Sequence, residues 1–379
     1  MIIMKILIGG PYVYKNQKIS GGVEAVLYNL KHGINQYEPD INLKIVSGSN
    51  KIQTKIEIDN DITYIQHSKI KLGSVFLSSY PFRVKDFLKK SDFDVLNYHS
   101  MDFSCYGYEI RKKLLVTLHG IPQEKNKFLP KYYQPIYHLV YIKKFEKILK
   151  YLKYLISINP YAREVIKNKT NAIIYDICNP VSNEFFDITN NWQENRIMYM
   201  GAISRMKNLL SLIKALNLVK NEIKDFKLII TGSIQDKNYF NEITSYINKR
   251  GFKDNIEYLG IIANKQKLDE FSKFSFLVLP SLNEHAPIVI SEAFAAGRPV
   301  IASNVGGIPY MVDDKKNGFL IDPKNERDIA DKIIYFLKNP GISKSMGSNG
   351  KKYAIKNNSL KTVVKKYKNA FEEIMEKCS

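Results

Sequence analysis

Residues 276–311 read FLVLPSLNEHAPIVISEAFAAGRPVIASNVGGIPYM, and this stretch decides the fold. The apolar run Phe276 to Leu279 predicts a buried strand. A helix is expected to begin near Pro287, a good first helical residue, and to end at Gly297. A second buried strand follows at Pro299 to Ala302. A strand, a helix and another strand in this order form a βαβ unit, so the stretch predicts a parallel sheet.

The same alternation of short β-rich runs and longer amphipathic segments continues through the whole chain. It is typical of parallel βα units and not of a β-sandwich or a helical bundle. Residues 178–194, CNPVSNEFFDITNNWQE, lack a sustained apolar period and read as a linker between two groups of strands. We therefore expect an α/β fold with two Rossmann-like, doubly wound domains, at residues 1–185 and 186–345, whose ligand site lies in the cleft between them. The expected strands are 3–8, 43–47, 93–98, 114–118, 154–158, 172–177, 197–200, 227–231, 256–259, 276–279, 299–302 and 319–321.

The composition is that of a folded protein. The 379 residues are 45% hydrophobic and 25% charged, and the length favours two domains or three. No window reaches about 18 uncharged apolar residues, and the N-terminal stretch 1–13 contains Lys5 and is too short for a signal peptide. Cys105, Cys178 and Cys378 fit neither a disulfide framework nor a zinc site. The chain is therefore expected to be soluble and cytoplasmic.

The net charge of +20 suggests a polyanionic partner: a nucleic acid, an anionic membrane or a phosphorylated substrate. The excess comes from lysine, with 49 lysines and 8 arginines. Proteins that read nucleic acid depend heavily on arginine for bidentate contacts to bases and phosphates. A basic nucleic-acid-binding protein therefore stays an alternative, and compositional drift toward lysine is another explanation of the charge.

Cations follow one expected strand of the second domain. Strand 197–200 leads into Gly201, and Arg205 and Lys207 lie in the loop before the next helix. Fixed cations at this place could hold a diphosphate without a metal. In a lysine-rich chain the same loop could also be an ordinary solvated one.

Two acids follow the strand at 276–279. Glu284 lies in the loop, and Glu292 lies eight residues later, between one and two turns into the helix. The amides of the first helical turn point toward the expected cleft. The first acid could bind sugar hydroxyls, and the second could accept both hydroxyls of a ribose. A helix salt bridge is the structural alternative for Glu292.

The first domain carries a glycine pair and two histidines. Gly21 and Gly22 open a helix after the first strand, where backbone N–H groups can approach an anion. The same pair also fits a loop hinge, because the chain has neither G-x-G-x-x-G nor a Walker motif. His99 and His119 each follow a strand, where a histidine is either catalytic or structural.

No metal site is expected. Asp59-Asn60-Asp61 and Asp92-Phe93-Asp94 have the D-x-D spacing of some metal sites, but both read as turns. The chain contains neither H-E-x-x-H nor C-x-x-C, so a zinc site is not expected.

Residues 125–154 form a basic segment with eight lysines and one acid, Glu146. From Tyr141 to Leu155 apolar residues recur at helical spacing, and Lys143, Lys147 and Lys150 share another face. This pattern fits either attachment to an anionic leaflet or a core-packed helix with a solvated face. The C-terminal residues 342–379 also have a helical apolar pattern, so we expect helix there and not a tail.

With these motifs in order, the chain resembles the glycosyltransferases of family 4, which have the GT-B fold. Glu284 to Glu292 matches the E-x7-E element of that family, flanked by Gly297-Arg298-Pro299 and by Gly306-Gly307. In such enzymes two Rossmann-like domains face a cleft, the second binds the donor nucleotide, and a C-terminal helix, here 346–379, returns to the first domain. The matching residues in chain order are Gly21, Gly22, His119, Gly201, Lys207, Glu284 and Glu292.

The resemblance implies the roles of these residues. The first Glu contacts the donor sugar, the second Glu contacts the ribose, and an Arg and Lys pair holds the diphosphate. The loop glycines approach phosphate and sugar, and His119 lies near the reacting sugar. Many members have Arg directly after the glycine, but this chain has Ala202, so Arg205 is the candidate substitute. Pro287 has no N–H to donate, so backbone contacts are expected from Ala286 and Ile288.

The expected function is therefore transfer of a hexose from a nucleotide diphosphate sugar, with retention of configuration, to a glycan or lipid-linked glycan in cell-surface polysaccharide or glycoconjugate synthesis. His119, Glu284, Arg205 and Lys207 are the expected catalytic residues, and no metal or other cofactor is expected beyond the donor. The enzyme is expected in the cytoplasm, with peripheral contact at the inner membrane face and no nucleic acid partner. A sugar-nucleotide epimerase of related fold is the alternative enzyme.

Overall fold

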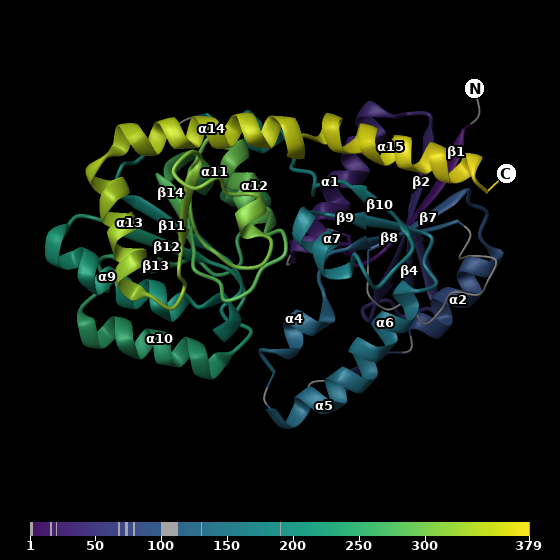
Figure 1. Cartoon of the computed structure of the whole chain (residues 1–379), viewed down its shortest axis with the longest axis horizontal. Coiled ribbons are helices and arrows are strands. Elements are labelled where there is room, and N and C mark those ends of the chain that lie inside the picture. Colours follow the sequence, from purple (N-terminus) through teal and green to yellow (C-terminus); the bar gives the residue numbers. More distant parts are fainter. Residues whose placement is uncertain are drawn as a thin grey trace. The chain divides into compact units, whose positions relative to one another are not determined.

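The chain divides into two compact units, each built on its own parallel sheet (Figure 1). Unit 1 comprises Met1–Gln17, Gly21–Pro180 and Leu360–Ser379, and unit 2 comprises Lys18–Ser20 and Val181–Ser359. Cys105 lies outside the described residues. This computed structural model describes residues 3–15, 17–19, 21–66, 69–72, 75–78, 80–99, 113–129, 131–189 and 191–378.

The sheet of unit 1 has eight strands in the order β10-β9-β8-β7-β1-β2-β4-β3. All neighbours are parallel except β3, which pairs antiparallel with β4. The central strands bury every residue or almost every residue, as the β-branched and leucine-rich runs predict. The strands are β1 (Met4–Gly9), β2 (Ile41–Ser49), β3 (Ile56–Asp59), β4 (Ile62–Gln66), β7 (Val95–Tyr98), β8 (Leu114–Leu118), β9 (Tyr154–Ser157) and β10 (Ile173–Asp176).

Helices connect these strands, and a short antiparallel pair, β5 (Lys69–Leu72) and β6 (Val75–Ser78), stands apart from the main sheet. One helical rod in unit 1 contains a π turn between two short α-helices (Figure 1). The helices are α1 (Gly22–Tyr37), α2 (Tyr80–Lys90), α4 (Pro122–Asn126), η1 (Lys131–Tyr133), α5 (Gln134–Tyr137), the π turn η2 (His138–Ile142), α6 (Lys143–Leu149), α7 (Pro160–Ile166) and α15 (Leu360–Glu376).

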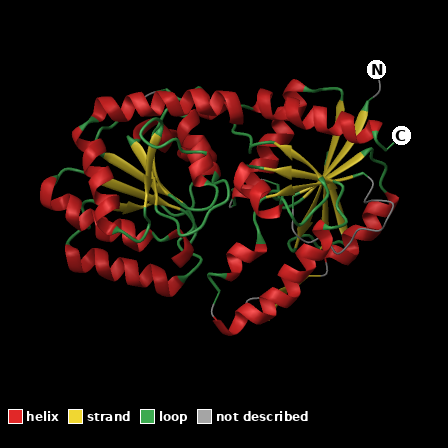
Figure 2. Cartoon of the chain, viewed as in Figure 1, coloured by secondary structure: helices red, strands yellow, loops and turns green. Residues whose placement is uncertain are grey.

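The sheet of unit 2 has six parallel strands in the order β13-β12-β11-β14-β15-β16, with helices on both faces (Figure 2). Each face has its own apolar core, one built with α9 and α13 and the other with α11, α12 and α14. This is the layered arrangement that a doubly wound sheet requires. The strands are β11 (Arg196–Met200), β12 (Lys227–Thr231), β13 (Ile256–Tyr258), β14 (Phe276–Leu279), β15 (Val300–Ser303) and β16 (Gly318–Ile321).

The helices of unit 2 begin and end where the local sequence predicts. The Asn325 side chain caps α13 by accepting from the Arg327 and Asp328 N–H groups at 3.1 Å, and Gly251, at a φ of +66°, ends α10. The helices are α8 (Asn183–Phe186), η3 (Arg205–Lys207), α9 (Leu209–Glu222), α10 (Lys237–Arg250), α11 (Asn264–Lys273), α12 (Ile288–Ala295), η4 (Ile308–Tyr310), α13 (Glu326–Lys338) and α14 (Pro340–Asn358).

The twelve expected strands are present, but β3 to β6 were not expected. The Asp59-Asn60-Asp61 motif is the turn of the β3–β4 hairpin, with Asn60 at a φ of +50°, as the turn interpretation of the D-x-D spacing predicts. Asp92 and Asp94 also lie before a strand, where they bind Lys5 through its ammonium at 2.6 Å and its backbone N–H at 2.8 Å.

The unit boundaries differ from the expected domain limits of 185 and 345. The chain passes into unit 2 at Val181, because that residue already pairs with Ser359 in a β-bridge. It returns to unit 1 only at Leu360, because α14 still belongs to unit 2, where it packs against α12. The C-terminal segment is helical as expected, and α15 packs against α1 of unit 1.

Candidate active site

Two candidate loops meet at one edge of the unit 2 sheet. β11 and β14 are parallel neighbours, so the loops that follow them leave the sheet at the same end. Lys207 closes the turn η3 after β11, and Glu284 lies in the loop after β14. The Lys207 ammonium donates a hydrogen bond to Oε1 of Glu284, and the Ser281 hydroxyl donates to the same oxygen at 2.9 Å. The structure thus brings the predicted Lys207 and Glu284 together.

Backbone contacts fix the position of this pair. The Leu282 N–H donates to the Met206 carbonyl at 2.8 Å, which joins the two loops. The Gly307 N–H donates to the Glu284 carbonyl at 2.9 Å. A Cβ on Gly306 would meet that carbonyl oxygen at 2.1 Å, and the φ of +53° there also favours glycine. The Gly306-Gly307 turn therefore holds the backbone of Glu284 in place.

The Lys207–Glu284 pair is largely removed from solvent. The Glu284 side chain is 9% exposed and the Lys207 side chain is 20% exposed. Each charge at this depth depends on the other for compensation, because neither has much water around it. An anionic group of a ligand would compete with Glu284 for the ammonium, and Glu284 would then be free to accept hydrogen bonds from hydroxyls.

Glu292 lies in α12 and is 2% exposed. Lys267 of α11 donates to its Oε1 at 2.6 Å, and the Lys267 ammonium also lies 5.2 Å from the centre of the Phe185 ring. The second oxygen, Oε2, is buried and has no hydrogen-bond partner among the residues that the structure describes. A buried carboxylate oxygen without a partner is costly, and a hydroxyl from a ligand would satisfy it.

A buried arginine ties the end of α11 to the chain after α12. Arg298 donates to the Phe271 carbonyl at 3.1 Å and to the Ser272 carbonyl at 2.5 Å, and its guanidinium stacks 4.6 Å from the Trp192 ring. Burial lowers its pKa to about 10. Arg298 therefore supports the helix that carries Lys267.

The start of α12 differs slightly from the expectation. Pro287 is the N-cap and not the first helical residue, so the helix begins at Ile288. Ala286 and Ile288 are both partly exposed beside the Glu284 loop. They remain the predicted backbone donors, since Pro287 has no N–H.

Gly201 and Arg205 do not join the pair formed by Lys207 and Glu284 through any contact given by the structure. The Gly201 N–H donates to the Thr231 carbonyl at 3.0 Å. The Arg205 guanidinium donates to Glu242 at 3.0 Å and stacks 5.1 Å from the Tyr239 ring, both in α10, and its side chain is 63% exposed. Arg205 is thus held by an acid of α10.

In unit 1 the two histidines follow the neighbouring strands β7 and β8. His99 Nδ1 lies 2.8 Å from His119 Nε2, and His99 Nε2 lies 2.6 Å from the Asn97 side-chain oxygen. Burial, with a smaller contribution from His119, holds the pKa of His99 well below its ordinary value. The structure therefore places His119 at the partly exposed end of a buried polar chain.

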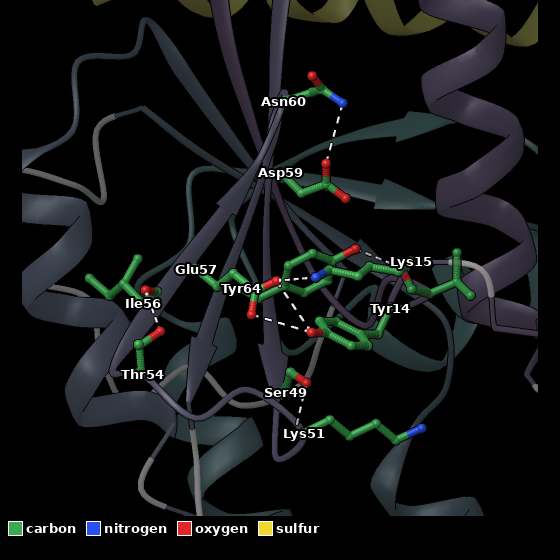
Figure 3. A network of polar contacts seen from close by, with 11 residues as sticks. Tyr14, Lys15, Ser49, Lys51, Thr54, Ile56, Glu57, Asp59, Asn60 and Tyr64 are labelled. Carbon is green, nitrogen blue, oxygen red and sulfur yellow. Dashed lines mark hydrogen bonds and ion pairs between the residues drawn. The ribbon is translucent and has the colours of Figure 1, made fainter.

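Gly21 is the N-cap of α1, and Gly22 is its first residue. The loop before them is tied to the β3–β4 hairpin by polar contacts, which Figure 3 shows. Glu57 accepts from the Tyr14 hydroxyl at 3.2 Å and pairs with Lys15 at 2.8 Å. The hydrogen bond from Lys15 lowers the pKa of the Glu57 carboxyl. An unpredicted hairpin thus anchors the loop that leads to the glycine pair.

Sequence reasoning missed Lys267 and Asn97. Lys267 is one of 49 lysines, and its helix carries no motif that separates it from the others. Asn97 lies inside a strand, where it reads as one polar position in an apolar run. Among the residues that the structure describes, no group of three or more His, Cys, Asp or Glu could hold a metal ion.

The chain is similar to several known proteins. Residues 181–353 match the family model described as glycosyl transferases group 1. An uncharacterized glycosyltransferase of Methanocaldococcus jannaschii is 27% identical over 94% of this chain and 95% of its own length. The poly(ribitol-phosphate) alpha-N-acetylglucosaminyltransferase of Staphylococcus aureus is 30% identical over 45% of this chain and 35% of its own length.

A solved structure extends the likeness to the whole chain. The Anabaena protein HepE, in complex with UDP and glucose, matches with a TM-score of 0.74 at 16% identity, over 97% of this chain and 99% of that one. The fold is that of the GT-B glycosyltransferases. The family model and the relatives describe glycosyltransferases, and the chain is similar to them.

Proposed function

We propose that this chain is a retaining glycosyltransferase that moves a hexosyl group from a nucleotide diphosphate sugar to a glycan or lipid-linked glycan. One observation carries the proposal: Glu292 is buried, ionically compensated by Lys267 and left with one unpartnered oxygen. A ligand hydroxyl that donates to this oxygen would offset the free-energy cost of leaving it without a partner. Glu284 and Glu292 belong to the same strand–loop–helix unit, so one donor molecule can use both.

The two acids are proposed to divide the donor between them. Glu292 Oε2 accepts from a ribose hydroxyl, and its charge stays compensated because Lys267 holds the other oxygen. Glu284 accepts from hydroxyls of the donor sugar once Lys207 turns to the diphosphate. Ala286 and Ile288 lie beside Glu284 and contribute backbone groups at the start of α12.

Charge development explains the role of Lys207. Breaking the bond between the sugar and the nucleotide diphosphate leaves positive charge on the sugar and negative charge on the departing oxygens. Lys207 is held by two loops and largely shielded from water, where a fixed cation stabilises developing negative charge most strongly. This cation does the work that a metal does at other diphosphate sites, so the proposed enzyme needs no metal and no cofactor beyond its donor.

The retention of configuration is proposed from the resemblance and from the residues around the reacting carbon. His119 is expected near the donor sugar, and neither Glu284 nor Glu292 is assigned as a covalent nucleophile. An acceptor hydroxyl that attacks from the side of the departing phosphate can pass its proton to that phosphate. The bond to the diphosphate breaks, the new glycosidic bond forms on the same face, and the proton leaves with the nucleotide.

The acceptor is proposed to belong to cell-surface polysaccharide or glycoconjugate synthesis. The S. aureus relative is named for poly(ribitol-phosphate), which is a polyanion. The net charge of +20 on this chain would attract a negatively charged acceptor of that kind. In the described part of the chain, no helix combines the length and the apolarity needed to cross a bilayer. We propose a cytoplasmic enzyme that meets its acceptor at the inner face of the membrane.

The test is release of nucleotide from a panel of UDP-, GDP- and ADP-sugars, with and without a polyprenyl-phosphate-linked glycan. We expect one donor to be consumed and the anomeric configuration to be retained in the product. Glu292→Gln should abolish most of the release, whereas the exposed Glu257→Gln is the matched control. A folded wild-type protein that consumes none of these donors would contradict the proposal.

A further inference from the structure

Exposed apolar side chains gather on one segment of unit 1, which we call the docking segment (residues 128–129 and 131–150). Tyr132, Ile136 and Leu139 are 71%, 51% and 64% exposed, and Phe128 and Val140 are more than a third exposed. Single exposed apolar residues are normal on a soluble protein. Five of them within 13 residues form a cluster, and such clusters mark binding surfaces.

The π turn determines which side chains of this rod face outward. Tyr137 and Ile142 are both buried although they are five positions apart, because the turn adds one residue to the helical repeat. Phe145 and Leu149 then continue the buried face through α6. The predicted helical spacing from Tyr141 to Leu155 therefore ends early, since α6 stops at Leu149 and the next strand follows.

The outward face has an apolar half and a basic half. Ile136, Leu139 and Val140 come first, and exposed Lys143 and Lys147 continue the same helical spacing, followed by Lys150 after the helix end. Figure 1 shows the rod from α5 to α6 that carries these residues. Apolar side chains and lysine stems side by side are the arrangement that a lipid headgroup region accepts.

The charge of the docking segment is positive and uncompensated. In the part of the chain that the structure describes, Lys143, Lys147 and Lys150 are given no ion pair. Glu146 accepts from Gln123 at 3.1 Å and lies 3.6 Å from Lys169, so it is already occupied. A charge pattern of this kind attracts an anionic surface and repels a basic one.

We infer that the docking segment binds the surface of an anionic lipid bilayer, with Ile136 and Leu139 entering the headgroup region and the three lysines contacting lipid phosphates. The clustering of exposed apolar side chains favours a binding surface over a merely solvated face, and the three lysines without an ion pair favour an anionic partner. At this surface the enzyme would meet its proposed lipid-linked acceptor, and to that extent the inference rests on the proposed function.

The test is sedimentation with vesicles of phosphatidylcholine alone and of equal parts of phosphatidylcholine and phosphatidylglycerol, at low and high salt. We expect salt-sensitive binding to the anionic vesicles only. Each lysine near an anionic surface contributes about fivefold to the partition coefficient. The triple variant Lys143→Gln, Lys147→Gln, Lys150→Gln should therefore lower partitioning roughly 100-fold at low salt. The double variant Ile136→Ser, Leu139→Ser should weaken binding at high salt as well, because the apolar contribution to binding does not depend on charge.

The matched control is Lys352→Gln, Lys356→Gln, Lys361→Gln, which changes the net charge equally at exposed positions of α14 and α15. It should leave binding nearly unchanged. Equal loss in the control, equal binding to both vesicles, or a wild-type dimer that Leu139→Ser dissociates would overturn the inference. Nucleotide release without vesicles tests the proposed transfer separately, since the docking-segment variants leave the donor residues intact.

Discussion

His99 Nδ1 and His119 Nε2 lie 2.8 Å apart, at the ends of two neighbouring strands. Asn97 decides which nitrogen carries the proton. Its amide nitrogen donates to the Leu115 carbonyl at 3.2 Å, so its oxygen is the acceptor that faces His99 Nε2 at 2.6 Å. His99 then donates from Nε2 and, when neutral, accepts at Nδ1. His119 therefore donates from Nε2, and the buried chain fixes its tautomer.

This arrangement predicts a loss of stability on mild acidification. Burial holds the pKa of His99 well below its ordinary value, so the unfolded chain binds a proton near pH 6.5 that the folded chain does not. The free energy of unfolding should then fall as the pH drops below about 6.5, by up to about 1.4 kcal/mol per pH unit, until the lower folded pKa is reached. Urea midpoints measured through this pH range check the slope.

The His99→Gln variant isolates the residue responsible. It should be less stable at neutral pH, but its slope with pH should be shallower than that of the wild type. The exposed His138→Gln is the control and should keep the wild-type slope. An unchanged slope in His99→Gln would assign the acid sensitivity to other groups.

Lys207 and Arg205 should behave differently when replaced. Lys207→Ala removes the cation bound to Glu284, and the loss of a charge-assisted hydrogen bond costs about 1.5 to 3 kcal/mol, or about 10- to 150-fold in donor affinity. Arg205→Ala removes an exposed side chain that α10 holds, so its effect on donor affinity should be much smaller. Calorimetry with the donor compares the two, and a larger loss for Arg205→Ala would reverse the assignment.

The sequence predicted the parts of this site that lie in loops after strands. The loops carrying Lys207 and Glu284 were predicted to follow strands of the second domain. That these two strands, β11 and β14, are neighbours comes from the sheet order of the structure and was not predicted. The sequence did not predict Lys267, because α11 is an ordinary amphipathic helix whose contact with Glu292 depends on how two helices pack. It also did not predict the β3–β4 hairpin, since each strand is short and their stability depends on pairing, of β3 with β4 and of β4 with β2.

Two variants of the Glu292–Lys267 pair should differ in the free energy of unfolding. Lys267→Met leaves a buried carboxylate without its cation and should cost about 3 kcal/mol in the free energy of unfolding. The double variant Lys267→Met, Glu292→Leu removes both charges and should recover most of that stability while losing donor affinity. Urea unfolding measures the first effect and calorimetry the second. A double variant that binds the donor normally would remove Glu292 from the site.

Turnover should be independent of added metal. Lys207 supplies a fixed positive charge at the proposed diphosphate position, so a chelator in excess should leave the rate unchanged. The measurement is product formation with chelator alone and after addition of Mg²⁺ or Mn²⁺. A complete loss that either ion restores would require a different mechanism for leaving-group stabilisation.

The last prediction concerns α15, which completes unit 1. Phe371 is fully buried there, and the Lys368 ammonium binds Glu38 at 2.7 Å and Asp40 at 2.8 Å. Phe371→Ala should destabilise the protein by about 3 to 5 kcal/mol, because it removes a large ring and leaves a cavity.

The exposed Lys361→Ala, on the same helix, should change the free energy of unfolding by about 0.5 kcal/mol or less. Tyr367 of α15 stacks on His99 with ring centres 6.5 Å apart, so truncation after Pro340 removes one wall of the histidine chain as well as the core contacts. We expect an insoluble or inactive truncate. A soluble and fully active one would show that α15 supports neither the core nor His119.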